Sequence, residues 1–114
     1  MKSNSTFYVM IFMTLFSISL GHSQDEDVLF QAFDWNVQNQ PAGQTWYDIV
    51  SQNRNTIKNA GIDVIWMPPP SDAASPQGYL PRELYNLNSA YGTKNQLVNL
   101  INQYHTLGIK VLSD

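Results

Sequence analysis

Short apolar runs alternate along this sequence with longer stretches in which apolar side chains recur every three or four positions. The runs have the length and content of buried strands, and they span Val28–Phe33, Ile62–Met67 and Ile109–Leu112. One stretch of helical spacing lies between each successive pair of runs. This order predicts an α/β fold with about three strands and two helices.

Both predicted helices carry start and stop signals. The first begins after Thr45, which has Asp48 three positions later, and the second begins after Thr93, which has Gln96 in the same relation. A threonine with an acidic or amide side chain three positions on is the spacing of a capping box. Glycines then end the helices at positions 61 and 108, so each helix passes into the next strand through a one-glycine turn.

The links between elements differ in length according to their direction. Helix-to-strand links are minimal, whereas the strand-to-helix links are long and polar. A (β/α)8 barrel has its active face on such long loops, and a doubly wound sheet alternates in the same way, so the pattern alone leaves both folds open. No Gly-x-Gly-x-x-Gly or Walker-type loop follows any predicted strand, which argues against nucleotide binding.

The N-terminal residues are typical of a targeting signal. Lys2 precedes an apolar run from Phe7 to Leu20, which is shorter than the roughly 20 residues that span a bilayer. We expect a signal peptide over residues 1–23, with a membrane-anchored N-terminus or a core helix as the alternatives. Removal of this segment would also remove Lys2. The remaining residues 24–114 contain five basic and nine acidic residues, a net charge of −4. The mature protein is therefore expected to be acidic and secreted, with no stable membrane anchor after cleavage.

Composition narrows the function classes. The net charge of −3 for 114 residues disfavours a nucleic-acid partner, which calls for a basic surface. The absence of cysteine excludes disulfides, thiolate metal ligands and a thiol nucleophile. His105, near the end of the second predicted helix, is expected to lie in solvent, where a cation suits the helix dipole.

The loop from Ser71 to Gly92 holds the most distinctive side chains. Tyr79, Tyr85 and Tyr91 lie there among amides and hydroxyls, a mixture that suits the flat faces and hydroxyl rim of a sugar. Loop tyrosines more often pack back onto the scaffold, so composition alone leaves sugar contact open for each of them.

Four motifs, in order and at the right spacing, resemble the N-terminal part of secreted alpha-amylases, which belong to the alpha-amylase family of glycoside hydrolases. They are Val28–Trp35 (VLFQAFDW), Val64–Pro69 (VIWMPP), Gln77–Tyr85 (QGYLPRELY) and Tyr91–Thr93 (YGT). One departure is visible, because family members usually carry Asp where Asn86 stands.

The resemblance implies that residues 24–114 are the N-terminal portion of a (β/α)8 TIM barrel, incomplete and ending in strand 3. The implied activity is endo-hydrolysis of α-1,4 bonds in starch and related glucans with retention of configuration, which requires two carboxyls about 5–5.5 Å apart. In the family these carboxyls follow later strands. No catalytic residue is therefore expected among the nine acidic residues present, Asp34 included, and this segment alone is expected to be inactive. A noncatalytic truncated product, at most a weak carbohydrate-binding module, is the alternative.

The resemblance also assigns binding roles. Tyr79 matches the tyrosine that stacks on the glucose ring before the scissile bond, and Gly78 is expected to permit a tight backbone there. Trp35 and Leu80 are weaker candidates for lining the cleft, and a structural role for Trp35 is equally favoured. Asp114 matches the first residue of a motif whose later Asn contributes to a calcium site. Calcium is thus implied as a cofactor, with its ligands outside this segment.

Overall fold

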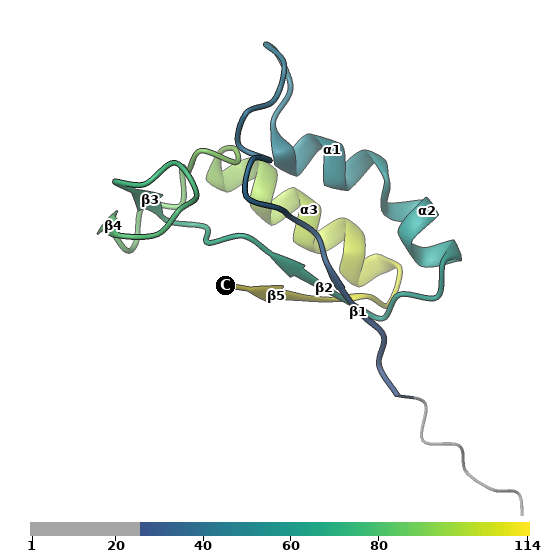
Figure 1. Ribbon diagram of the computed structural model, residues 1–114. Helices are drawn as coiled ribbons and strands as arrows, with labels where there is room; N and C mark the ends of the chain where they lie inside the picture. Colours follow the sequence, from purple (N-terminus) through teal and green to yellow (C-terminus); the bar gives the residue numbers. More distant parts are fainter. Residues whose placement is uncertain (1–25) are drawn as a thin grey trace, which may run out of the picture.

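The computed structural model describes residues 26–114, and the expected signal peptide over residues 1–23 lies outside that range. A parallel sheet of three strands, β1 (Leu29–Gln31), β2 (Val64–Met67) and β5 (Lys110–Ser113), has the order β1-β2-β5. Helices α1 (Trp46–Gln52), α2 (Arg54–Asn59) and α3 (Lys94–Thr106) lie together on one face of this sheet (Figure 1). The predicted α/β alternation is present, although β1 and β2 are shorter than the expected ranges and β5 is shifted by one residue.

The core lies between the sheet and the helices. Ile65 and Met67 of the central strand are fully buried, as are Leu100 and Tyr104 of α3. The Tyr104 hydroxyl donates a 2.8 Å hydrogen bond to the backbone carbonyl of Val50, which ties α3 to α1. Since a buried hydroxyl without a partner is costly, this bond satisfies the only polar group that the ring brings into the core.

Both capping boxes form as predicted. The Thr45 hydroxyl accepts a hydrogen bond from the Asp48 backbone N–H at the start of α1, and Thr93 and Gln96 repeat the arrangement at the start of α3. The stretch between Thr45 and Gly61, however, is not the single helix that its spacing predicts. It is divided at Asn53, whose φ of −87° and ψ of 3° depart from helical values, although its backbone N–H and its side-chain amide both donate to the Ile49 carbonyl, at 3.2 and 2.9 Å.

The long loop after β2 contains an antiparallel hairpin that the sequence pattern did not predict. Its strands are β3 (Asp72–Ala73) and β4 (Pro81–Glu83), so the described chain has five strands and three helices instead of three and two. The hairpin projects from the end of the sheet toward which β2 runs (Figure 1). Its strands are too short for a periodicity of their own to be recognised. Within residues 26–114, no helix is long and apolar enough to cross a membrane.

Candidate active-site cleft

The carboxyl ends of the three parallel strands bring distant parts of the sequence to one edge of the sheet. Trp35 follows β1, the long loop with its hairpin follows β2, and Asp114 follows β5 (Figure 1). In open and closed parallel α/β sheets alike, this edge is where ligands bind. The candidate site is therefore built from segments that are far apart in the sequence.

Trp35 and Tyr79 form a stacked pair at this edge. Their ring centroids are 6.2 Å apart and their planes are inclined by 22°. Trp35 is 64% exposed and Tyr79 is 43% exposed, so the pair presents aromatic surface to solvent. Together with Gln31, Asp34 and other neighbours, the two rings line a cavity of about 130 Å³. Such flat, exposed aromatic surface suits a sugar ring.

The hydroxyl of Tyr79 is held by a carboxylate. It donates a 2.7 Å hydrogen bond to Oδ2 of Asp114, and this bond, which the neutral phenol makes, raises the pKa of Tyr79 above its usual value. The phenol thus remains a neutral donor at the pH values at which proteins normally work. Leu80, the third predicted site residue, is 72% exposed with a left-handed φ of 61°, and its side chain extends from the same turn into solvent.

The turn that carries Tyr79 has the tight backbone expected of Gly78. This glycine has φ of 93°, and a Cβ on it would lie 2.9 Å from Cβ of Pro69. The turn is closed by two backbone hydrogen bonds, from Gly78 N to the Ser75 carbonyl (3.1 Å) and from Ser75 N to the Tyr79 carbonyl (3.2 Å). Only a residue without a side chain fits between this turn and Pro69.

Tyr91 and Tyr85, the other loop tyrosines, have opposite environments. Tyr85 is 96% exposed, whereas Tyr91 is 1% exposed and donates its hydroxyl to the Gln77 carbonyl at 2.5 Å. Burial raises the pKa of Tyr91 to about 12. The sequence alone did not indicate which of the two tyrosines is buried. The structure shows the reason beside Tyr91: a Cβ on Gly92 would lie 2.6 Å from the ring of Tyr47, so this segment is packed closely against α1.

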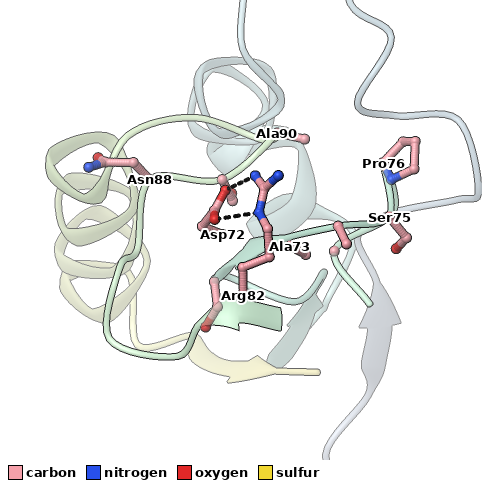
Figure 2. A pocket seen from close by; sticks show the side chains of 11 residues that line it. Asp72, Ala73, Ser75, Pro76, Arg82, Asn88 and Ala90 are labelled. Carbon is pink, nitrogen blue, oxygen red and sulfur yellow. Dashed lines mark hydrogen bonds and ion pairs between the residues drawn. The ribbon is translucent and has the colours of Figure 1, made fainter. Parts of the chain in front are cut away.

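The hairpin is closed by an ion pair between Arg82 and Asp72. The guanidinium of Arg82 donates to both carboxylate oxygens of Asp72, at 2.9 and 2.6 Å, across a hollow of about 380 Å³ (Figure 2). These hydrogen bonds lower the pKa of Asp72. Arg82 therefore fixes the two strands of the hairpin to each other.

Asn86, the departure from the family pattern, has a defined local role. Its side-chain amide donates to Oε2 of Glu83 at 3.1 Å, and its side-chain oxygen accepts from the backbone N–H of Asn88 at 3.1 Å. An aspartate at this position would keep the second bond and would set its carboxylate against Glu83. Asparagine is therefore better suited than aspartate to position 86, next to Glu83.

Asp34 and His105, the other two residues that the sequence singled out, show no catalytic arrangement. Asp34 accepts a 2.8 Å hydrogen bond from the backbone N–H of Asn36, so its carboxylate stabilises the turn after β1. His105 is exposed in the last turn of α3, as expected. Over residues 26–114, no three histidine, aspartate or glutamate side chains converge as ligands of a metal ion would.

Parallel strands with helices on one face and long loops after their carboxyl ends are the arrangement of a (β/α) domain. A family described as the catalytic domain of alpha amylase matches residues 29–114, so this chain belongs to the alpha-amylase family. The described strands and helices are accordingly the N-terminal part of a (β/α)8 barrel, which resolves the choice between barrel and doubly wound sheet.

Individual relatives agree with this assignment. Alpha-amylase 3, chloroplastic, of Arabidopsis thaliana is 39% identical over 97 residues, covering 85% of this chain and 11% of the relative. The glucan 1,4-alpha-maltotetraohydrolase of Stutzerimonas stutzeri is 34% identical over 103 residues, covering 82% and 18%. Among solved structures, an alternansucrase in complex with isomaltotriose has a TM-score of 0.71 at 21% identity, covering 77% of this chain and 10% of that one. This chain therefore spans only about a tenth to a fifth of the length of such relatives.

Proposed function

We propose that the complete protein is a secreted alpha-amylase that hydrolyses internal α-1,4 bonds of starch and related glucans with retention of configuration. The family match over residues 29–114 and the names of the relatives, which include an alpha-amylase and a maltotetraohydrolase, support this activity class. Retention requires a nucleophilic carboxylate and an acid/base carboxyl about 5–5.5 Å apart. On this proposal, both come from sequence that follows Asp114, and the calcium ligands come from there too.

The observation that carries the proposal is the exposed stack of Trp35 on Tyr79 at the carboxyl edge of the sheet. Trp35 supports one side of the phenol ring and leaves the rest of the ring accessible, while Asp114 holds the hydroxyl. A ring held in this way loses little freedom when a sugar packs against it. Tyr79 accordingly stacks on the glucose unit next to the scissile bond, and Trp35 and Leu80 line the cleft beside it.

Replacement of Tyr79 by alanine in the complete protein tests this role. We expect Tyr79→Ala to lower kcat/KM on soluble starch by about ten- to a hundredfold, since both the stacking surface and its orientation are lost. Tyr85→Ala is the matched control, because Tyr85 lies in the same loop but is 96% exposed. Wild-type activity in Tyr79→Ala would disprove the stacking role, and failure of the complete wild-type protein to release reducing sugar from starch would disprove the proposed function itself.

A further inference from the structure

Tyr91 connects the turn that carries Tyr79 to the packed core. Its backbone carbonyl accepts a 3.2 Å hydrogen bond from Tyr47 N in the first turn of α1, and its backbone N–H donates to the Ser89 hydroxyl at 3.2 Å. Its ring lies 6.5 Å from the ring of Tyr47, centroid to centroid, and is almost completely buried. The position of Tyr91 is therefore set mainly by its packing against Tyr47 and its bond to the start of α1.

From this buried position, the hydroxyl of Tyr91 donates a 2.5 Å hydrogen bond to the backbone carbonyl of Gln77, which lies in the turn that carries Tyr79. Gln77 is two residues before Tyr79, within the turn that the hydrogen bonds of Ser75 and Gly78 close. Gly78, the residue between Gln77 and Tyr79, lies close to Pro69, since a Cβ on it would be 2.9 Å from Cβ of Pro69, so the turn has little space to move in that direction. A shift at Gln77 would therefore move the phenol of Tyr79.

We propose that Tyr91 is a positioning residue for Tyr79: its buried hydroxyl fixes the Gln77 carbonyl and so holds the Tyr79 ring in the orientation that receives the sugar. The inference rests on the proposed role of Tyr79 and adds Tyr91, an almost completely buried residue in the wall of the cavity that Trp35 and Tyr79 line. Trp35 and Asp114 hold the side chain of Tyr79, whereas Tyr91 holds the backbone two residues earlier, at the Gln77 carbonyl. The two kinds of support are independent, so loss of the Tyr91 hydroxyl reduces the activity without abolishing it.

Tyr91→Phe removes the hydroxyl and keeps the buried ring, so the fold is preserved. Tyr104→Phe is a closely matched control, because Tyr104 is also a fully buried tyrosine that donates to a backbone carbonyl, with a pKa that burial raises to about 12, but its partner is Val50. We expect Tyr91→Phe to lower kcat/KM on soluble starch about tenfold. Tyr104→Phe, with a similar loss of stability, is expected to stay within about twofold of wild type.

A double-mutant cycle with Tyr79→Ala separates positioning from general destabilisation. If Tyr91 acts through Tyr79, then Tyr91→Phe causes no further loss of kcat/KM once Tyr79 is alanine. An equal loss in the presence and absence of the Tyr79 ring, or an equal loss in Tyr104→Phe, would overturn the proposal.

Hydrogen exchange provides a readout that does not depend on starch hydrolysis. We expect the backbone amides of residues 75–80 in the complete protein to exchange faster in Tyr91→Phe than in wild type or Tyr104→Phe, because the turn has lost its attachment. Unchanged exchange there would overturn the positioning role whatever the activity. Faster exchange in a protein without activity on starch would instead disprove the proposed function and leave the attachment of the turn established.

Discussion

At the scale of single residues, two glycines with nearly the same backbone geometry differ in their surroundings. Gly78 has φ of 93° and Gly43 has φ of 87°, both in the left-handed region that side chains disfavour. A Cβ on Gly43 would have no atom within 4 Å, whereas a Cβ on Gly78 would lie 2.9 Å from Cβ of Pro69. Gly78 is therefore required for close packing as well as for its backbone angle.

We predict that Gly78→Ala destabilises the protein more than Gly43→Ala. Both variants lose about 1–2 kcal/mol through the left-handed backbone. Gly78→Ala should lose at least about 1 kcal/mol more, because Pro69 is a rigid neighbour and the overlap cannot be relieved by rotating a side chain. Denaturant unfolding of the complete protein measures the difference, and equal losses in the two variants would show that the turn moves away from Pro69 at no cost.

At the scale of elements, one side chain joins the starts of two helices. Gln96 accepts the backbone N–H of Thr93 at 2.9 Å, which completes the capping box of α3. Its amide nitrogen also donates to the Thr45 hydroxyl at 3.1 Å and to Oδ2 of Asp48 at 2.9 Å, in the capping box of α1. The two caps thus form one hydrogen-bonded network, which sets the spacing of α1 and α3 behind the cleft.

Gln96→Glu is expected to break this connection while keeping the local cap. The new carboxylate still accepts from Thr93 but faces the carboxylate of Asp48, so we expect a loss of about 1–2 kcal/mol at neutral pH. Part of the loss should be recovered near pH 4, where one carboxylate is protonated. Asn95→Glu, an exposed charge in the same helical turn, should be neutral or slightly stabilising. Thermal unfolding at both pH values checks this, and equal behaviour of the two variants would contradict it.

At the scale of the whole molecule, the described sheet has two unpaired edges and one uncovered face. β1 and β5 are the edge strands, and their exposed apolar side chains include Leu29 (53%) and Leu112 (51%). The register places Leu112 beside Trp66, and Leu29 beside Val64. In a closed barrel such side chains fill the interior, whereas in three strands alone they remain in water.

We predict that residues 24–114, prepared alone, self-associate and release no reducing sugar from starch. Leu112→Lys should reduce the association, since a charge on an edge strand opposes pairing with a second sheet. Val98→Lys is the control, because Val98 is similarly exposed (44%) but lies on α3. Size-exclusion chromatography with light scattering measures the association. A monomeric segment, or one that hydrolyses starch, would contradict the prediction.

The sequence by itself determined the features that depend on near neighbours. Strand and helix periodicity and the two capping boxes were predicted and are present. Each arises from residues within a few positions of one another, where rotamers, caps and φ preferences act directly. The family motifs were readable for the same reason, since each is a short contiguous string.

Only the tertiary structure decided which distant residues meet. It placed Trp35 on Tyr79, paired Arg82 with Asp72, turned Tyr91 inward while leaving Tyr85 outside, and let Gln96 join two helices. These contacts follow from the parallel register of β1, β2 and β5, which brings the segments after the strands to one edge. No local pattern encodes them, because a side chain in a loop finds its partner only when packing of the sheet and helices has fixed where the loop begins and ends.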